Sequence, residues 1–431
     1  MPQQNLDVQR NRWRLSDTPL LRSHQLSRLN RLLADATSNQ PFYQQKYHGI
    51  RLPLESLDDL TRLPLLEKAE LITGGVASIC GLPKDRYVRL HQTSGTCGDP
   101  LRMLDTAEDW QWWLECWQYV LDAADAGVGD VAMMAFSYGP FIGFWTAHES
   151  CVARGVTVIP GGGMDSVSRL KMIVRCEATI ICCTPTYALH LATVASEHGI
   201  DIKNCAVSRI IVAGEPGGSI AAVRQRIESL WGARLVDHCG ATELGAWGVG
   251  SRDGRGIHVI ESEFIAECLV FDDESPSGRV AQDNELSELV ITGLGRYGSP
   301  AIRYRTGDLV RPQQSSDPEN RFLYLDGGVL GRADNMVVVR GVNVFPSSIE
   351  AIVRRVGGDA EYRVIQSERD SMTQLRVEIE SVASTPELPD RLSAAFREHL
   401  GLRIDVRPIA IASLPRFDAK ARRWICETET D

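Results

Sequence analysis

The stretch His91–Arg102 has the residue types of a phosphate-binding loop. It reads His-Gln-Thr-Ser-Gly-Thr-Cys-Gly-Asp-Pro-Leu-Arg and follows a strand-like run, Tyr87–Leu90. Glycine lets a backbone approach a ligand closely, so that neighbouring N–H groups and hydroxyls can surround phosphate oxygens. The stretch lacks the Gly-Lys-Ser/Thr ending of a Walker loop. Taken alone, it is better explained as a polar turn between two strands.

Two further segments have side chains suited to chemistry. Asp308 directly follows Gly307, and a carboxylate in such a turn can accept from both hydroxyls of a ribose or can cap its own turn. The segment Leu414–Arg423 carries four cations in a short stretch. A run of that kind is usually a solvated tail. The residues alone leave both segments open between a functional and a structural role.

Alternating apolar runs and helix-length segments between Asp130 and Glu243 predict a parallel, doubly wound sheet. The expected strands are Val131–Phe136, Val156–Ile159, Thr179–Cys183, Arg209–Ala213 and Arg234–Asp237. The expected helices are Gly143–Arg154, Asp165–Arg175, Thr186–His198 and Ser219–Trp231. Ligands of such sheets bind beyond the carboxyl ends of the strands. The loops at those ends are small or polar: Ser137–Pro140, Pro160–Gly163, Thr184–Tyr187, Gly214–Gly218 and His238–Glu243.

Other segments complete the expected fold. Helices are expected from Leu20 to a point before Pro41 and over Thr106–Ala126, and antiparallel β structure over Gly256–Leu325. After a junction at Gly331–Met336, a βαββαβ order predicts a small ferredoxin-like domain. Its expected elements are strands Val337–Arg340, Tyr362–Ser367, Gln374–Ile379 and Ile404–Ile409, and helices Ser347–Val356 and Pro389–Leu400. The predicted fold is thus a large domain with a mainly parallel doubly wound sheet and an antiparallel β subdomain, followed by a small α+β domain.

Composition restricts the class of protein. A chain of 431 residues is too long for one core, and its net charge of −10 without a dense Lys/Arg stripe disfavours a nucleic-acid partner. The N-terminal residues lack the apolar region of a signal peptide, and no apolar run is long enough to span a bilayer. The eleven cysteines contain no Cys-x-x-Cys pair, which indicates reduced thiols in a cytoplasmic protein rather than a structural zinc site.

Six motifs, in this order, resemble those of the adenylate-forming acyl-CoA synthetase superfamily. They are Thr93–Pro100, Gly214–Gly218, Asp237–Glu243, Tyr304–Asp308, Gly331–Glu350 and Leu414–Lys420. Arg340–Glu350 and the stretch ending Gln40-Pro41-Phe42-Tyr43 are most similar to the phenylacetate–CoA ligase branch. The resemblance spans nearly the whole chain. It implies that a carboxylate attacks the α-phosphate of ATP to give an acyl-adenylate and pyrophosphate, and that a thiol, usually of coenzyme A, then displaces AMP.

The resemblance also implies roles for individual residues. Lys420 would bridge the attacking carboxylate and the phosphate, Glu243 would bind Mg²⁺, and the Thr242 hydroxyl would lie near the α-phosphate. Asp308 would bind the ribose hydroxyls, with Arg332 close by. The residues expected around the phosphates are Thr93, Ser94, Gly95, Thr96 and Gly98, and those expected around the adenine are Gly214, Glu215, Pro216, Asp237, Cys239, Gly240 and Ala241.

The expected acid pocket is apolar and aromatic, which suits an aryl or arylacetic acid. Its walls would be Tyr138, Gly139, Phe141, Phe144, Trp145 and the Gly214 loop. His148 is more often a satisfied core histidine than a base, and His238 is at most a neighbour of the site.

By the same resemblance the chain divides into residues 1–333, which bind ATP and the acid, and residues 334–431, which form a mobile domain carrying Lys420. Asp334 would be the hinge. Rotation at Asp334 would move Lys420 out of the site and bring Arg340–Pro346 into it, where these residues would line the thiol channel.

Three departures from the family pattern bear on function. Asp99 stands where a lysine is usual, with Arg102 as the compensating cation, and Cys239 stands where an aromatic residue usually packs on adenine. Branch members often have cysteines in the segments that correspond to Leu325–Leu330 and Gly248–Arg255, and this chain has none there. No structural zinc is therefore expected.

Two alternatives to an acid–CoA ligase follow from these departures. The enzyme could adenylate an acid but pass the acyl group to a carrier protein or an amine. A non-catalytic protein that binds a nucleotide or an acyl-adenylate would also tolerate Asp99 and Cys239. Retention of both Glu243 and Lys420 argues against the pure binder. The expected partners are a small carboxylic acid, ATP, Mg²⁺ and coenzyme A, without nucleic acid or membrane, and a homodimer fits the branch.

Overall fold

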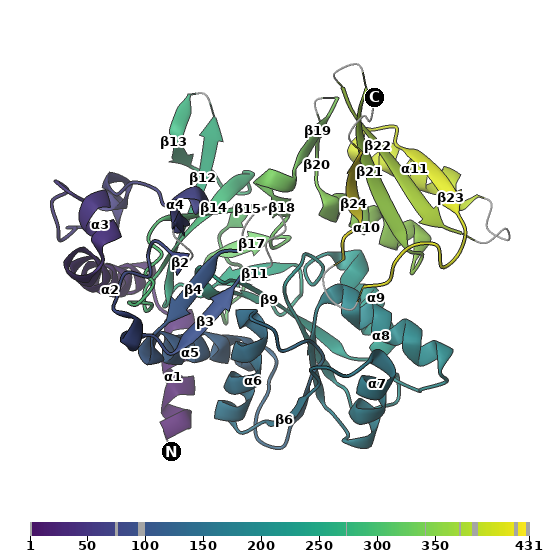
Figure 1. Cartoon of the computed structure of the whole chain (residues 1–431), viewed down its shortest axis with the longest axis horizontal. Helices are drawn as coiled ribbons and strands as arrows, with labels where there is room; N and C mark the ends of the chain where they lie inside the picture. Colours follow the sequence, from purple (N-terminus) through teal and green to yellow (C-terminus); the bar gives the residue numbers. More distant parts are fainter. Residues whose placement is uncertain are drawn as a thin grey trace.

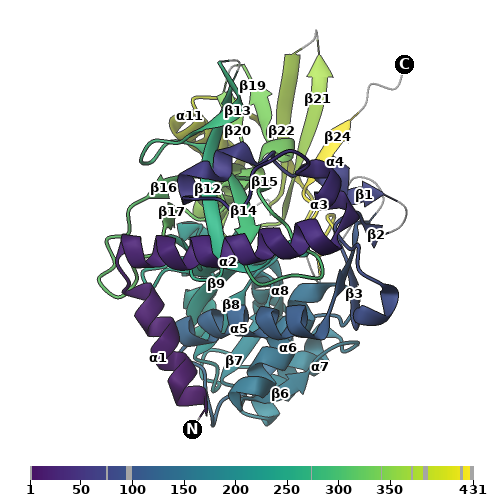
Figure 2. The ribbon, with the colours of Figure 1, turned by 90° about the vertical axis from the view of Figure 1, so that its left-hand side faces the viewer.

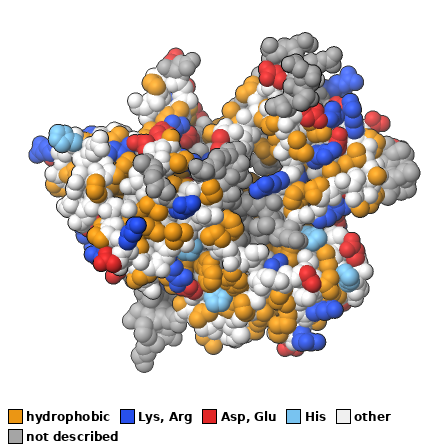
Figure 3. Space-filling view, in the orientation of Figure 1, with side chains coloured by type: hydrophobic (Ala, Val, Ile, Leu, Met, Phe, Trp, Pro, Cys, Tyr) orange, Lys and Arg blue, Asp and Glu red, His pale blue; other side chains and the backbone are white. Residues whose placement is uncertain are grey.

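Figure 1 shows the computed structural model of the chain, which describes residues 2–73, 76–93, 100–272, 274–340, 342–369, 372–381, 387–417 and 421–427. A large body is followed by a smaller α+β unit, drawn in yellow-green and yellow at the upper right. The predicted fold class is confirmed. In the described residues, no helix has both the length and the apolar character needed to cross a membrane. Figure 3 shows basic and acidic side chains interspersed over one face.

The central element is a nine-stranded sheet with the strand order β16-β17-β11-β10-β9-β8-β7-β5-β6. Five of its strands are parallel: β5 (Val131–Met134), β6 (Thr157–Pro160), β7 (Ile180–Cys183), β8 (Arg209–Val212) and β9 (Arg234–Ala241). The others continue it antiparallel: β10 (Gly245–Gly250), β11 (Gly256–Val259), β16 (Pro312–Gln313) and β17 (Tyr324–Asp326). The five predicted strands therefore form one parallel sheet.

Helices cover both faces of the parallel strands, because adjacent residues on each strand point to opposite sides. In β5, Ala132 and Met134 join a core with α5 (Ala107–Ala123) and α6 (Ile142–Arg154), whereas Met133 joins a second core on the other face. The second core includes side chains of α7 (Ser166–Arg175), α8 (Pro185–Glu197) and α9 (Ala221–Trp231). Residues with a side-chain oxygen cap three of these helices: Thr106 for α5, Asp165 for α7 and Thr184 for α8.

A second, five-stranded antiparallel sheet has the order β13-β12-β14-β15-β18 and confirms the predicted β subdomain. Its strands are β12 (Phe264–Asp272), β13 (Ser275–Val280), β14 (Ser287–Gly293), β15 (Tyr304–Val310) and β18 (Gly331–Arg332). Figure 2 shows α2 (Thr18–Asn39) lying across the large body, where the Gln25 side-chain amide donates to the carbonyl oxygens of Glu261 and Phe264 over 2.9 and 3.0 Å.

The N-terminal third consists of helices and short strands. The predicted helix is α2 (Thr18–Asn39), which ends before Pro41 as expected, while the helix α1 (Pro2–Arg14) was not anticipated. The remaining elements of this third are α3 (Pro41–Lys46), α4 (Lys68–Leu71), the 3₁₀ turns Leu57–Arg62 and Lys84–Arg86, and strands β1 (Ile72–Thr73), β2 (Val76–Ala77), β3 (Arg89–Gln92) and β4 (Arg102–Asp105). A further 3₁₀ turn, Ala333–Asn335, precedes the small unit.

The small unit has its own core and differs from the prediction in one strand. The strands are β19 (Val337–Val339), β20 (Val342–Val344), β21 (Tyr362–Arg369), β22 (Met372–Glu380), β23 (Asp405–Ile409) and β24 (Trp424–Glu427), and the helices are α10 (Pro346–Gly357) and α11 (Leu388–Leu400). Its sheet has the order β23-β22-β21-β24.

Strand β19, predicted as part of this sheet, instead forms a hairpin with β20. Arg340 adopts a φ of +49° and turns the chain back at once, so that Val337 pairs with Val344. The edge of the sheet beside β21 is instead formed by β24, a strand of the C-terminal segment that pairs in parallel with β21. The predicted boundary between residues 333 and 334 stays a prediction.

Candidate active site

The glycine loop joins two antiparallel strands, β3 and β4, whose last pair is Gln92 with Arg102. Its base is closed by Thr93, whose N–H donates to the carbonyl of Leu101 over 2.9 Å and whose Oγ1 accepts from the Leu101 N–H over 3.1 Å. The Gln92 N–H donates to the carbonyl of Pro140 over 2.8 Å, which attaches the loop to the carboxyl end of β5. The predicted phosphate contacts Ser94, Gly95, Thr96 and Gly98, and also Asp99, lie outside the described residues.

Asp237 ties the Gly214–Gly218 loop to strand β9. Its Oδ2 accepts from the Ser219 hydroxyl over 2.7 Å and its Oδ1 accepts from the His238 N–H over 3.0 Å. A Cβ on Gly218 would lie 2.4 Å from Asp237 Oδ1, so this close approach requires glycine. Burial raises the pKa of Asp237 to about 6. Two of the loops expected at the adenine are therefore held together by one buried carboxyl group.

Glu243 and Thr242 follow β9 and are fixed from two sides. The buried Glu243 carboxylate accepts through Oε1 from the Tyr304 hydroxyl over 3.2 Å. The Thr242 carbonyl accepts from Arg296 Nη1 over 2.8 Å. Arg296 in turn donates through Nε to Asp105 Oδ1 over 2.8 Å, at the end of β4. The strand that leaves the glycine loop and the turn that carries Thr242 are thus connected through one buried guanidinium group.

Asp308 lies beside Arg332 because β15 and β18 pair at these two residues. Arg332 Nη1 lies 3.4 Å from Asp308 Oδ1 and donates to the Thr306 carbonyl over 3.1 Å, and its Nε donates to Asp334 over 2.9 Å. Burial raises the pKa of Asp308 to about 7, the Arg332 guanidinium opposes the rise, and the nearby Glu243 carboxylate adds to it. The structure therefore brings Glu243, Asp308 and Arg332, which are far apart in the sequence, into one electrostatic environment.

On the predicted acid side, Tyr138 packs among aromatic rings. Its ring centroid lies 4.9 Å from that of Trp145 and 5.8 Å from that of His148, both in edge-to-face arrangements. A Cβ on Gly162 would lie 2.4 Å from Tyr138 Cδ2, so the ring rests directly on the loop after β6. Trp145 Nε1 donates to the Gly139 carbonyl over 3.0 Å. Phe141 is 36% exposed, and the side chain of Phe144 lies outside the description.

Four polar side chains of the candidate site and its surroundings differ in their contacts and pKa values. Within the described part of the chain, the buried atoms Tyr138 Oη and His148 Nδ1 have no hydrogen-bonding partner, so His148 is not the satisfied core histidine that the sequence favoured. His238 Nδ1 lies 2.9 Å from the Gly248 carbonyl, and burial lowers the pKa of His238 to about 4. Burial also raises the pKa of the Cys239 thiol, which keeps it protonated.

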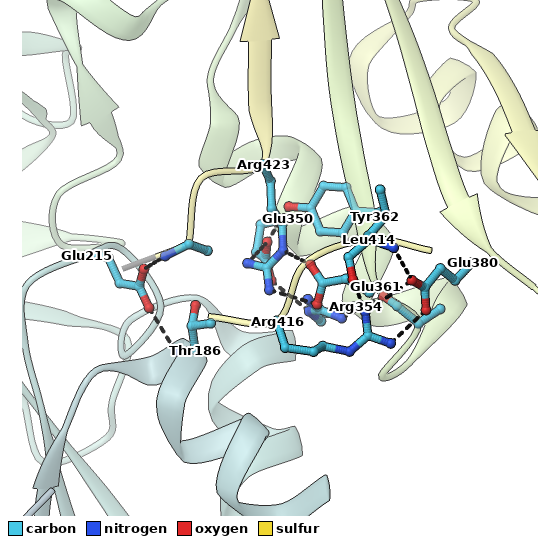
Figure 4. A network of polar contacts seen from close by, with 12 residues as sticks. Thr186, Glu215, Glu350, Arg354, Glu361, Tyr362, Glu380, Leu414, Arg416 and Arg423 are labelled. Carbon is cyan, nitrogen blue, oxygen red and sulfur yellow. Dashed lines mark hydrogen bonds and ion pairs between the residues drawn. The ribbon is translucent and has the colours of Figure 1, made fainter. Parts of the chain in front are cut away.

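Lys420 lies outside the described residues, but the segment around it contacts the candidate site. The N–H of Ala421 donates to Glu215 Oε2 over 3.0 Å, and the N–H of Thr186 donates to Glu215 Oε1 over 2.8 Å (Figure 4). Ala421, which follows the predicted adenylation lysine in the sequence, therefore contacts the Gly214–Gly218 loop. The roles predicted for the individual site residues stay predictions.

Sequence reasoning missed Arg296 and Asp105, which hold the site together. Both are almost fully buried, and Arg296 is only 1% exposed. They lie 191 residues apart, and neither belongs to a recognisable motif. Nothing in the chain order indicates their contact, although an isolated charge in an apolar stretch is a general signal for a buried pair.

One carboxylate among the described residues fits a Mg²⁺ ligand. Glu243 offers a hard oxygen ligand, and its Oε1 is oriented by the Tyr304 hydroxyl. Over the same ranges, no group of three or more His, Cys, Asp or Glu residues is arranged to hold a metal ion. The expectation that the protein lacks zinc stays a prediction.

The chain is similar to known ligases over nearly its whole length. A model of the AMP-binding enzyme C-terminal domain matches residues 341–427. A phenylacetate-coenzyme A ligase of Pseudomonas putida is 30% identical over 93% of this chain and 93% of its own length. One of Escherichia coli (strain K12) is 29% identical over 94% of both chains.

Solved structures give the same result for the fold. The chain superposes with a TM-score of 0.88 on a 2-hydroxyisobutyryl-CoA ligase in its postadenylation state, at 24% identity, covering 96% of this chain and 91% of that chain. With the same ligase in its thioesterification state the TM-score is 0.71, at 25% identity and the same coverage. Together with the sequence identity to the Pseudomonas putida ligase, these findings show that the chain belongs to the phenylacetate–CoA ligase branch of the adenylate-forming acyl-CoA synthetase superfamily.

Proposed function

We propose that the protein uses ATP to activate a carboxylic acid and then transfers the acyl group to coenzyme A. The observation that carries this proposal is the convergence of Glu243, Asp308 and Arg332 beyond the carboxyl end of β9, with Ala421 of the C-terminal segment on the adjoining loop. That placement is what an adenylating site needs, because the lysine preceding Ala421 must reach the reacting phosphate. The names of the similar ligases support the same two steps.

In the first step a carboxylate oxygen bonds to the α-phosphorus of ATP, and the bond to pyrophosphate breaks. Two anions must meet, so the protein contributes mainly positive charge and positioning. Lys420 would lie between the attacking oxygen and the α-phosphate, and Asp308 would hold the ribose hydroxyls beside Arg332. The residues Thr93–Gly98 would surround the outgoing phosphates. Glu243 would hold Mg²⁺, which supplies positive charge at the phosphates when bound.

In the second step the thiol sulfur of coenzyme A bonds to the acyl carbon, and AMP leaves with the bonding electrons. Arg340–Pro346 would line the path of the thiol after the domain carrying Lys420 has rotated about Asp334. A pair between Arg332 and Asp334, 2.9 Å apart, lies at this point of the chain and supports a hinge there, since breaking one exposed pair costs little. The predicted division at residues 333 and 334 rests on the same argument.

The acid is proposed to be an aryl or arylacetic acid. Tyr138 and Trp145 present aromatic surface beside the strand ends, and Phe141 is partly exposed next to them. A planar apolar acid buries such surface well. A carrier protein or an amine as acceptor remains the rival for the second step.

A screen of pyrophosphate exchange tests the first step. Exchange that depends on an added aryl or arylacetic acid, followed by formation of acyl-CoA when coenzyme A is supplied, is the expected result. Exchange without acyl-CoA would favour a carrier protein or an amine as acceptor. No exchange over a broad panel of aryl and alkyl acids would leave a non-catalytic nucleotide-binding protein as the better proposal.

Two features of the protein's setting are proposals of the same kind. All described cysteines are free thiols, which supports a reducing, cytoplasmic location. A homodimer fits the branch and is tested by the molecular mass in solution.

A further inference from the structure

The C-terminal segment 414–423 is anchored to the small unit at its first end by Glu380. Arg416 makes a two-pronged ion pair with this residue, with Nη1 to Oε1 at 3.0 Å and Nη2 to Oε2 at 2.7 Å. The Leu414 N–H donates to the same carboxylate over 2.8 Å. The Glu380 side chain is only 2% exposed. Paired hydrogen bonds between guanidinium and carboxylate fix both partners in direction as well as distance.

The second end of the segment is anchored by Arg423, as Figure 4 shows. Its guanidinium group pairs with both carboxylate oxygens of Glu361 and lies 3.4 Å from Glu350 Oε2. Glu350 also pairs with Arg354 at 2.6 Å and accepts from the Tyr362 hydroxyl. The Arg423 side chain is 11% exposed. Residues 417 and 421, which flank the predicted adenylation lysine, therefore belong to a segment held firmly to the small unit at both ends.

Between Arg416 and Arg423, the segment contacts the carboxylate of Glu215 in the large body. Glu215 accepts from Thr186, in the first turn of α8, with one oxygen and from Ala421 with the other, over 2.8 and 3.0 Å. The position at the start of α8 favours the ionised carboxylate through the helix dipole. Burial acts in the opposite direction and raises the pKa of Glu215. The carboxylate thus uses its two oxygens to connect backbone groups from the two bodies.

An ion pair between the two bodies, Arg226 with Asp359, is more exposed than this hydrogen bond. Arg226 of α9 donates through Nε to Asp359 Oδ1 over 2.7 Å, but these side chains are 37% and 43% exposed. Exposed pairs contribute little to holding two bodies together. The chain also superposes better on the postadenylation form of the solved ligase than on its thioesterification form, with TM-scores of 0.88 and 0.71. The arrangement of the two bodies that includes the Glu215 contact is therefore closer to the postadenylation form of that ligase than to its thioesterification form.

We propose that Glu215 is a positioning residue, whose carboxylate holds the backbone at Ala421 against α8 and so favours the domain arrangement in which the acid is adenylated. This inference rests on the proposed function. The contact must break when the small unit rotates, so it supports the first half-reaction and contributes nothing to thiol transfer. Glu215 acts through the segment that it holds and touches no reacting atom.

Glu215→Gln tests the proposal with a minimal change of shape. A glutamine keeps one acceptor oxygen but places an NH₂ group where the second N–H needs an acceptor, so one of the two contacts is lost. Acid-dependent pyrophosphate exchange is expected to fall about tenfold to a hundredfold at saturating ATP, the range that corresponds to one hydrogen bond to a charged acceptor. The conversion of a supplied acyl-adenylate to acyl-CoA is expected to stay within about twofold, because that step does not use the contact.

Arg226→Ala is the matched control, because it removes the exposed interdomain pair and leaves the segment untouched. It is expected to change neither half-reaction by more than about twofold. Equal losses in both half-reactions of Glu215→Gln, or unchanged exchange, would overturn the proposed role. The melting temperature of each variant shows that the fold is intact.

Limited trypsin digestion tests the contact between Glu215 and Ala421 without any substrate. Cleavage between residues 416 and 423 is expected to be faster in Glu215→Gln than in the wild type, and unchanged in Arg226→Ala. Equal cleavage in Glu215→Gln and the wild type would overturn the inference even if exchange were slower. If the wild type showed no exchange with any acid, the proposed function would fail, while the digestion would still decide whether Glu215 holds the segment.

Discussion

Arg296 and Asp105 form an ion pair in the interior of the large body, with Nε and Oδ1 2.8 Å apart and side chains that are 1% and 0% exposed. Arg296 also holds the Thr242 carbonyl. The pair therefore connects the strand that follows the glycine loop to the turn before Glu243. A buried pair of this kind is costly to break on one side, because the remaining charge is left without a partner.

Arg296→Met is accordingly expected to lower the free energy of unfolding by about 3 to 5 kcal/mol, since the buried Asp105 would lose its guanidinium partner and keep only His91 nearby, at 3.7 Å. Denaturant unfolding measures the change. Arg252→Ala is the matched control, because Arg252 pairs with Glu319 at 3.0 Å on the surface. No measurable loss is expected there. A loss of similar size in both variants would mean that burial of the Arg296 pair has no special consequence.

The affinity for ATP is expected to depend on pH through Asp308. Only the ionised carboxylate accepts from both ribose hydroxyls, and the pKa of Asp308 is about 7, so the apparent affinity should rise as the pH increases through 7. Titrations of ATP binding between pH 6 and about pH 8 test this. In Asp308→Asn this part of the pH dependence should disappear. An unchanged pH profile in the variant would assign the effect to another group.

The stability of the free protein should change in the opposite direction with pH. The folded-state pKa of Asp308 is raised from 3.8 to about 7, so the folded protein favours the neutral carboxyl group. Its contribution to the free energy of unfolding is fully present below pH 3.8 and is lost as the pH rises through about 7. Asp308→Asn should therefore gain stability relative to the wild type at pH 8 compared with pH 5, as measured by denaturant unfolding. A constant difference would contradict the raised pKa.

Lys420→Ala should slow the adenylation half-reaction far more than the conversion of a supplied acyl-adenylate to acyl-CoA. The lysine would neutralise charge where carboxylate and phosphate meet, and loss of such a contact costs about a hundredfold or more. Pyrophosphate exchange and thioester formation measure the two steps separately. Arg422→Ala serves as the control, because this neighbouring cation is exposed. Equal losses in the two steps of Lys420→Ala would refute the assigned role.

Asp99→Lys should raise the apparent affinity for ATP, because it replaces an anion with a cation in the proposed phosphate loop. At short range this charge reversal corresponds to about tenfold in affinity. The titration is repeated at high salt, where screening should reduce the gain. An affinity that does not change at low salt would mean that residue 99 points away from the phosphates, or that another loop holds them.

Several elements were predictable from local chemistry. Strands β5 and β7 are short, buried on both faces and therefore contiguous in apolar residues, and helices α7 and α8 begin directly after capping residues, Asp165 and Thr184. The segment around Asp308 was expected to be a turn, but it is part of strand β15, so local residue types did not decide its conformation.

The assignment of strands in the small unit could not be predicted in the same way. A β-strand needs a neighbour, and nothing local distinguishes Val337–Val339, which forms a hairpin, from Trp424–Glu427, which completes the sheet. The left-handed φ of Arg340 turns the chain so that Val337–Val339 forms the hairpin. The ion pair of Arg423 with Glu361 lies directly before Trp424–Glu427 in the chain and holds the start of that strand at the sheet. Both depend on the path of the chain.

The sequence by itself determined the family and most of the order of the elements, and it indicated candidate residues for handling phosphate and carboxylate. These follow from periodicity, turn chemistry and motif order, which are properties of neighbouring residues. Only the tertiary structure decided which distant groups meet. The contacts of Arg296 with Asp105 and of Glu215 with Ala421 join residues 191 and 206 positions apart. Such contacts arise because burial removes water as a partner, so that each buried polar group must find another one within the fold.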